Sequence, residues 1–184
     1  MRRYFFPKPY ADRVQRLRVP FGFFLVAAFA GLSHPTQLSL AWGLPVALCG
    51  VALRAWAAGH LAKNQQLARS GPYAWTRNPL YLGTALTALG LVLAGRSFIL
   101  GALFLAAFLL VYLPAIELEE QHLRTLFPEY PAYAAQVPLL VPRFPPARSI
   151  ARFRISLYLK NQEYQALLGF LLGAGFLVWK WRAF

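Results

Sequence analysis

Long apolar runs separated by short polar segments dominate the chain. Five runs are apolar enough to enter a bilayer: residues 19–32, 38–59, 80–95, 97–116 and 164–181. A helix needs about 20 residues, with roughly 17–25 as the usual range, to cross the hydrocarbon layer. The second and fourth runs have that length, the third is slightly short, and the first can extend backward because arginine side chains snorkel. The pattern predicts four core transmembrane helices and a fifth, C-terminal apolar helix.

The composition excludes an ordinary soluble domain. The 184 residues are 58% hydrophobic and 14% charged, whereas soluble domains average about 45–50% and about 25%. The same apolar content excludes a disordered chain. We therefore predict an all-α integral membrane protein.

The polar segments divide this single membrane domain, residues 1–184, into four parts. Residues 1–18 form a basic N-terminus, 19–116 hold the four core helices, 117–148 form a connector, and 149–184 form an extension with the fifth apolar helix. A helix is expected to continue into the connector from the fourth span.

Prolines predict further breaks in the helices. After residue 127 the connector has a proline every few residues, which favours extended chain lying against the membrane surface. Tyr130 and Tyr133 are expected to pack mainly at that interface, with pocket lining as the alternative. Pro45 and Pro114 are expected to kink or end their helices.

Basic residues predict the orientation of the bundle. They gather before the first span, in residues 60–79 and in 117–163, while the intervening turns carry only Arg96. The positive-inside rule then places the N-terminus and both long polar segments in the cytoplasm, as in a bacterial inner membrane. Lys180 and Arg182 would lie outside, so the fifth helix can also be re-entrant or interfacial.

The net charge of +13 would indicate nucleic-acid binding in a soluble chain. In a membrane chain, cytoplasmic loops and anionic lipid explain it, so we expect no nucleic-acid partner. Cys49 is the only cysteine, and the three histidines are far apart in the sequence. We therefore expect no metal site.

Residues 71–83 contain the first cluster of unusual polar chemistry. Asn78 and Pro79 suit the N-cap and first position of the third core helix. The unpaired N–H groups and positive dipole of such a helix start bind anionic groups. Arg77 adds a forked cation, and Tyr81 lies one turn further on. This pattern predicts a carboxylate or phosphate site, unless Arg77 snorkels to headgroups and Tyr81 belongs to an aromatic belt.

The second cluster follows the fourth span. If its helix continues, Glu117 lies on a solvated stripe, whereas Glu119 and Glu120 point along the apolar side. Carboxylates placed there are costly unless they meet a cation or strong donors. They are expected to serve a polar site, or a structural salt bridge with Arg77 or Arg54.

The runs GPYAWTRNPLYLG (71–83), EEQHL (119–123) and FPEYPAYAAQVPLLVP (127–142) resemble the isoprenylcysteine carboxyl methyltransferase family and the related phosphatidylethanolamine N-methyltransferases. That family has Arg-His-Pro-x-Tyr-x-Gly followed by Glu-Glu-x-x-Leu, and the resemblance covers residues 53–144. It implies a membrane enzyme that transfers a methyl group from S-adenosylmethionine to a lipophilic acceptor at the cytoplasmic face, with the connector completing the active site.

The resemblance transfers residue by residue. Arg77, Pro79, Tyr81 and Gly83 match the first motif, and Glu119, Glu120 and Leu123 match the second, whereas Asn78 stands where the family has histidine. An asparagine can donate a hydrogen bond but cannot act as a base.

The predicted site combines these matches with neighbouring polar residues. The cofactor-binding residues are predicted to be Lys63, Gln66, Tyr73, Arg77, Asn78, Pro79, Tyr81, Glu119 and Glu120. The catalytic residues are predicted to be Arg77 and Glu120, with Glu120 as a base if the acceptor is an amine or alcohol.

Two other classes stay open. Membrane sterol-type reductases share a related helix arrangement and use NADPH, and a scaffold or lipid-binding protein would need no catalysis. The sequence leaves the acceptor and the oligomeric state undetermined.

Overall fold

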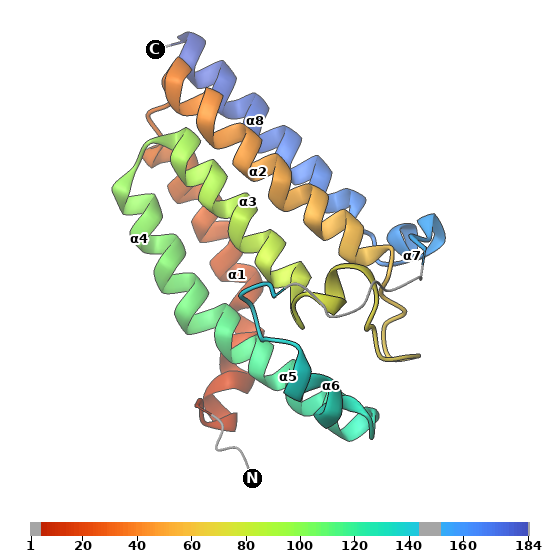
Figure 1. Ribbon diagram of the computed structural model, residues 1–184. Helices are drawn as coiled ribbons and strands as arrows, with labels where there is room; N and C mark the ends of the chain where they lie inside the picture. The colour runs from red at the N-terminus through yellow and green to blue at the C-terminus, as the bar shows by residue number, and fades with distance from the viewer. Residues whose placement is uncertain (1–4, 144–151, 184) are drawn as a thin grey trace.

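The computed structural model describes residues 5–143 and 152–183, and this part of the chain is helical without strands. Figure 1 shows a bundle of long helices with shorter helices gathered at one end. The elements are α1 (Lys8–Leu32), α2 (Gln37–Ala58), η1 (Gly71–Ala74), α3 (Pro79–Gly95), α4 (Phe98–Ala107), η2 (Phe108–Tyr112), α5 (Leu113–Leu126), α6 (Tyr130–Gln136), α7 (Ile155–Lys160) and α8 (Tyr164–Ala183).

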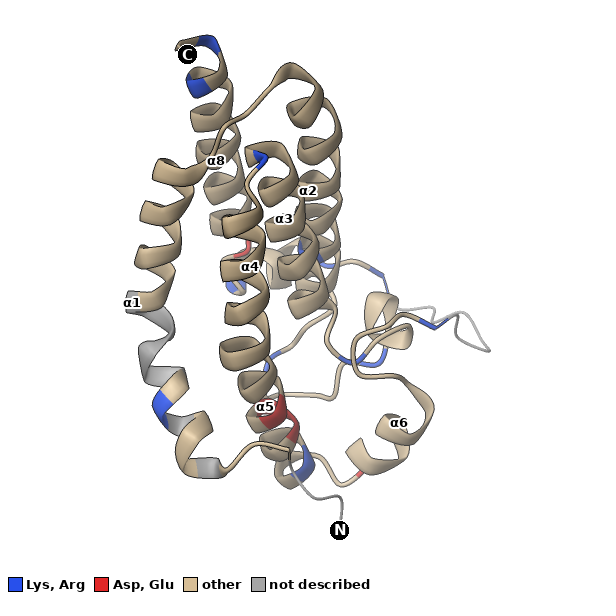
Figure 2. Ribbon diagram, turned by 90° about the vertical axis from the view of Figure 1, so that its left-hand side faces the viewer, with Lys and Arg blue, Asp and Glu red and all other residues tan. Residues whose placement is uncertain are grey.

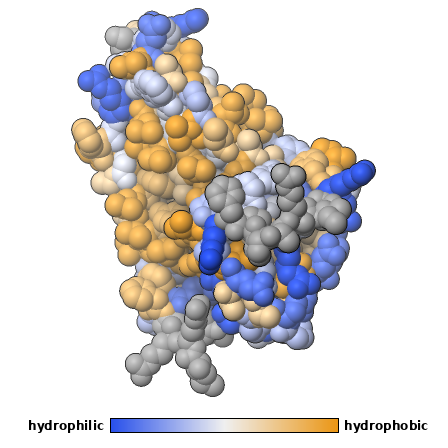
Figure 3. Space-filling model, viewed as in Figure 1, coloured by the Kyte–Doolittle hydropathy of each residue, from blue (hydrophilic) through white to orange (hydrophobic). Residues whose placement is uncertain are grey.

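The bundle has the dimensions and surface of a membrane protein. Three continuous helices are long and apolar enough to cross a bilayer, Gln37–Ala58, Phe98–Leu126 and Tyr164–Ala183, and two shorter apolar helices accompany them, Phe21–Leu32 and Pro79–Gly95. Large apolar side chains point outward, and a broad hydrophobic surface covers the bundle above a hydrophilic end (Figure 3). The prediction of an all-α membrane protein with five apolar helices is confirmed.

Small residues bring α2 and α3 into close contact. A Cβ added at Gly43 would collide with the backbone of Ala94, and one added at Gly90 would collide with the backbone of Ala47. Because lipid offers no hydrophobic drive for helix association, such close packing is a main source of stability. The pair α2–α3 therefore forms the closely packed centre of the bundle, against which α4 and α8 pack.

Pro45 and Pro114 were expected to kink or end their helices. Neither proline ends its helix, so that part of the expectation is wrong. Helix α2 passes through Pro45, and the helix from α4 to α5 passes through Pro114 after the π-helical turn η2. A proline cannot donate its missing N–H and crowds the preceding turn. The π-turn (Phe108–Tyr112) widens the helix directly before Pro114, where the proline ring would otherwise crowd the preceding turn.

One end of the bundle, which we call the site end, carries η1, α5, α6 and α7 (Figure 1). The expectation of extended chain after residue 127 is wrong for Tyr130–Gln136, which forms α6. Its proline, Pro131, lies in the first turn, where a missing N–H breaks no helical bond. The following chain pairs with the segment before α3, because Arg77 N–H donates to Pro138 O at 2.9 Å and Arg143 N–H donates to Trp75 O at 2.9 Å.

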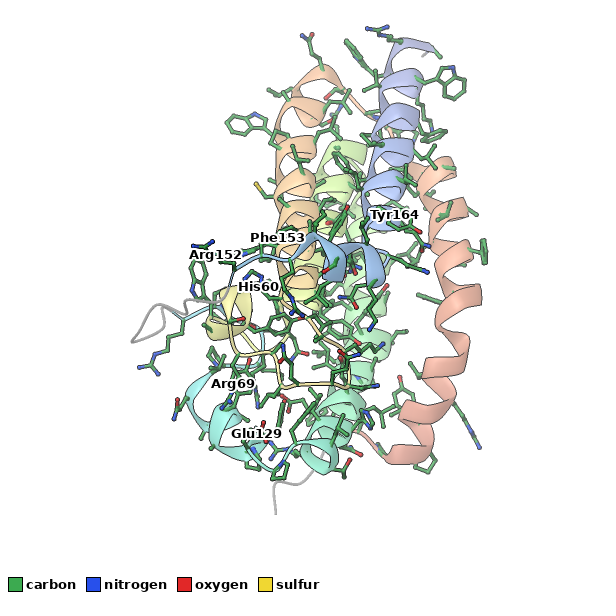
Figure 4. The ribbon with its side chains drawn as sticks, turned by 90° about the vertical axis from the view of Figure 1, so that its right-hand side faces the viewer. His60, Arg69, Glu129, Arg152, Phe153 and Tyr164 are labelled. Atoms are coloured by element: carbon green, nitrogen blue, oxygen red, sulfur yellow. The ribbon has the colours of Figure 1, made fainter. Side chains whose placement is uncertain are left out.

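The C-terminal extension is tied to the end of α2. Asn161 donates its side-chain amide to the carbonyls of Ala58 and Leu61, at 3.0 and 2.9 Å. Phe153 lies against His60, with ring centroids 6.4 Å apart (Figure 4). The backbone N–H of Arg154 also donates to the Gly59 carbonyl at 3.0 Å, so the extension supplies donors to carbonyls at and just after the end of α2. The expected subdivision at residue 149 falls within residues 144–151, outside the described residues.

Candidate functional site

A cavity of about 460 Å³ lies at the site end, among the loop after α2, the start of α3 and the helices α5 and α6. This size is within the range of about 300–1,000 Å³ typical of small-molecule sites. Its lining residues are Leu61, Lys63, Asn64, Gln66, Leu67, Ala68, Tyr73, Arg77, Asn78, Pro79, Leu80, Tyr81, Ala115, Leu118, Glu119, His122, Leu123, Phe127, Tyr130 and Tyr133.

The structure brings the two sequence motifs to this cavity. Lys63, Gln66, Tyr73, Arg77, Asn78, Pro79, Tyr81 and Glu119 line it. Glu120 is the one predicted site residue outside the lining, and it lies directly behind Arg77. The cavity therefore joins the helix start of the first motif to the acidic step of the second.

Arg77 is the most buried charge of the site. Its side chain is 6% exposed, and its Nη1 lies 3.0 Å from Glu120 Oε1, whose side chain is 14% exposed. The contact is an ion pair without hydrogen-bond alignment, because Nε and Nη1 are buried without a hydrogen-bond partner among the described residues. A buried guanidinium with unused donors is costly unless something else accepts from it. The geometry therefore leaves Arg77 able to bind an anionic group in the cavity.

The structural salt bridge considered from the sequence is thus present for Arg77 and Glu120. Arg54 has a different partner, Glu163, which it contacts through Nε at 3.0 Å and Nη2 at 2.8 Å. This second pair joins α2 to the residue directly before α8. It fixes the C-terminal extension and does not line the cavity.

Tyr130 holds the carboxylate that pairs with Arg77. Its hydroxyl donates to Glu120 Oε1 at 2.8 Å. Burial raises the pKa of Tyr130, and the charge of Glu120 and the hydrogen bond to it raise the pKa further. The phenol therefore stays protonated and keeps donating to the carboxylate.

Tyr73 and Tyr133 form another part of the wall. The Tyr133 hydroxyl donates to the backbone carbonyl of Tyr73 at 2.7 Å. Burial raises the pKa of both phenols, and Glu119 also raises that of Tyr73. Tyr130 and Tyr133 were expected mainly at the interface, but both are buried and line the cavity. Their spacing of three residues places them on one face of a helix, which is the signal that could have indicated this.

Asn78 and Pro79 occupy the N-cap and first position of α3, as predicted, but the Asn78 side chain does not cap the helix. The side chain instead donates to Leu139 O at 3.2 Å, beside Thr76 Oγ1, which donates to the same carbonyl at 3.0 Å. Capping would require the side-chain oxygen to accept an N–H group of the first turn, whereas here the amide nitrogen donates to the connector. The first turn of α3 consequently has no side-chain acceptor from its cap residue.

Glu119 is exposed at the cavity wall, so the prediction of two desolvated acids is wrong for this residue. Helix α5 continues past the bundle, and its side facing the cavity stays uncovered there. Glu117 is instead partly buried, because its carboxylate accepts the backbone N–H groups of Phe5 and Phe6, at 2.6 and 3.0 Å. Of the neighbouring acids Glu119 and Glu120, Glu120 is the one whose side chain is largely buried.

His122 and Asn64 also line the cavity, although the sequence analysis gave them no site role. His122 lies three residues after Glu119 and therefore shares its side of α5. Tyr81 lines the cavity as predicted, and its ring centroid is 6.2 Å from that of Tyr112 in the π-turn.

The fold and the cavity define an integral membrane protein with a polar, charged site at one end of its apolar bundle. The chain belongs to the phospholipid methyltransferase family, whose sequence model matches residues 51–130. That range contains both motifs and all of the predicted cofactor-binding residues. The resemblance found in the sequence is confirmed at the level of the family.

Two curated bacterial proteins are similar to the chain. The cobalt-zinc-cadmium resistance protein CzcN of Cupriavidus metallidurans is 37% identical over 54% of this chain and 49% of its own length. The nickel-cobalt-cadmium resistance protein NccN of Alcaligenes xylosoxydans is 32% identical over 78% of this chain and 70% of its own length. The chain thus spans about half of the first relative. No solved structure matches it significantly.

Proposed function

We propose that the protein transfers a methyl group from S-adenosylmethionine to a lipophilic acceptor at the cytoplasmic face of the membrane. Membership of the phospholipid methyltransferase family supports methyl transfer. The observation that carries the choice of donor is the buried Arg77 guanidinium, which lines a cavity of small-molecule size and keeps Nε and Nη1 without a hydrogen-bond partner among the described residues.

The residues of the cavity fit the charges of S-adenosylmethionine. Arg77 and the uncapped start of α3 suit its carboxylate, because forked cations and helix N-termini both favour anions. Glu119, which is exposed and lines the same cavity, suits its ammonium. Tyr73 and Tyr81 offer aromatic surface to the adenine or the sulfonium cation. When bound, this donor supplies a methyl group on a positively charged sulfur.

Glu120 is proposed as a positioning residue for Arg77. Its Oε1 accepts a hydrogen bond from the Tyr130 hydroxyl and lies next to Arg77 Nη1. The carboxylate therefore holds the guanidinium in place. The sequence also suggested that Glu120 removes a proton from an amine or alcohol acceptor. The two roles affect donor affinity and turnover differently, so kinetics can separate them.

The surroundings of the cavity support a lipophilic acceptor. Leu80, Ala115 and Leu118 line it, and α3 and α5 continue from it into the apolar bundle. An acceptor with a long apolar group can therefore place its reactive atom in the polar cavity while its apolar part stays in lipid. The chain would hold the two reactants in line, and such positioning lowers barriers by up to about 7–11 kcal/mol.

The test is a titration of the purified protein with S-adenosylmethionine and, separately, with NADPH. Binding of the former only supports the proposal. Binding of NADPH only would indicate a reductase, and binding of neither would indicate a scaffold. Incubation with methyl-labelled S-adenosylmethionine and total bacterial lipid extract should then give a labelled product in the lipid phase. Identifying that product defines the acceptor.

A further inference from the structure

A second cavity, of about 550 Å³, lies far from the site and is lined entirely by apolar residues and glycines. It is bounded by α1, α3, α4 and α8. Helix α1 packs on α4 and α5, whereas α8 packs on α2 and α3. Between α1 and α8 remains a groove with Leu91 and Val92 of α3 among its lining residues.

The two helices are joined where both of them end, which we call the far end. The rings of Phe29 and Phe176 lie 6.1 Å apart, and both line the groove. Lys180 Nζ donates to Ala30 O at 2.8 Å and to Gly31 O at 3.4 Å. The ammonium thus lies at the end of the groove, on the C-terminal carbonyls of α1. An ammonium has three donors, so these two contacts leave one for another acceptor.

The far end carries cations without acids. Arg96, Lys180 and Arg182 are its basic residues among those described (Figure 2). All six acids of the chain lie in other segments: Asp12, Glu117, Glu119, Glu120, Glu129 and Glu163. Basic residues beside a membrane attract anionic lipid by about 1 kcal/mol each. The charge therefore favours a net-anionic headgroup over a zwitterionic one.

We propose that this groove binds one anionic glycerophospholipid, with an acyl chain along α3 between α1 and α8 and the headgroup phosphate at Lys180. The apolar lining matches the acyl chain, and the ammonium at its end matches the phosphate. This site is separate from the cavity of the proposed function. It joins α1 to α8 through a lipid in the groove that both helices line.

The experiment uses the full chain in detergent, incubated with phosphatidylglycerol or with phosphatidylcholine of the same acyl chains. Lipid retained per protein is measured by native mass spectrometry. The wild type should retain about fivefold more phosphatidylglycerol, which corresponds to about 1 kcal/mol. Lys180→Gln should remove this preference. Lys160→Gln, which removes the same charge from exposed α7, should keep it.

A second pair of variants tests the groove itself. A Cβ at Gly169 or at Gly175 meets nothing within 4 Å, but only Gly169 lines the groove. Gly169→Leu should lower the retention of both lipids, and Gly175→Leu should not. Equal retention of the two lipids by the wild type, or equal effects within either pair of variants, would overturn the proposal. A dimer that Gly169→Leu converts to a monomer would also overturn it, since a second chain would then fill the groove.

Discussion

The Arg77 guanidinium lies 3.0 Å from the Glu120 carboxylate, and Arg77 lines the cavity whereas Glu120 does not. Arg77 precedes α3 and Glu120 lies on α5, so their contact joins two motifs that are distant in the sequence. An arginine that one carboxylate holds in place can donate its remaining N–H groups to an anionic ligand.

Arg77→Lys should weaken the binding of S-adenosylmethionine by about 10- to 100-fold. The lysine keeps the charge but loses the planar fork, and charge-assisted hydrogen bonds contribute about 1.5–3 kcal/mol. Calorimetric titration of the purified protein measures the change. Arg69→Lys, on the exposed loop nearby, is the matched control and should bind normally. An unchanged affinity for the Arg77 variant would remove Arg77 from the donor site.

Glu120→Gln should raise the KM for S-adenosylmethionine, because Arg77 loses its partner charge. A fall in kcat at saturating donor, beyond the change in KM, would in addition identify Glu120 as the base. Steady-state kinetics at varied donor concentration separate the two effects. Glu129→Gln removes an exposed carboxylate outside the cavity and should leave both constants unchanged. If Glu120→Gln behaves like this control, Glu120 has neither role.

The protein should lose stability as the pH rises above 10.0, the ordinary pKa of tyrosine. The folded state raises the pKa of Tyr130 by burial and by Glu120, so it keeps a proton that the unfolded chain releases. Stability is therefore complete below the unfolded pKa and falls between the unfolded and folded values. Thermal unfolding at increasing alkaline pH measures this. Tyr130→Phe should flatten the dependence, and Tyr164→Phe, at an exposed position, should not.

Glu163→Gln should lower the free energy of unfolding by about 1–3 kcal/mol, the range for a charged hydrogen bond left without its partner. The substitution removes the negative partner of Arg54, whose side chain is 24% exposed, so the upper end of the range is not expected. Denaturant unfolding in detergent measures the change. Glu129→Gln is again the matched control. A stability equal to the wild type would show that the pair does not fix the extension.

The membrane fold can be predicted from the sequence because each apolar segment is recognisable by itself. The apolar run 80–95 predicts α3 (Pro79–Gly95) almost to the residue, because hydrophobic length alone determines what a bilayer accepts. Arg77 and Tyr81, which the sequence singles out because helix starts and basic residues are recognisable locally, both line the cavity.

The contacts that hold the site residues and the C-terminal extension in place could not be predicted in this way. Glu119 and Glu120 are neighbours on α5, and which of them is buried depends on how far the bundle covers that helix. The pair of Arg54 and Glu163 depends on where the C-terminal extension docks. The burial of Tyr130 and Tyr133 depends on the packing of α6 against the loop after α2. Each of these contacts forms between segments distant in the sequence, which periodicity does not specify.

The amide of Asn78 and the hydroxyl of Thr76 both hold the carbonyl of Leu139, while the backbone N–H of Arg77 holds Pro138. Three consecutive residues thus fasten the connector to the very segment that carries the guanidinium. The part of the cavity lined by Arg77 and Asn78 is therefore shaped before any ligand arrives, which reduces the entropy lost on binding. The short amide of Asn78 contributes to this preorganisation through its hydrogen bond to Leu139. Asn78→His would replace that amide with a larger ring.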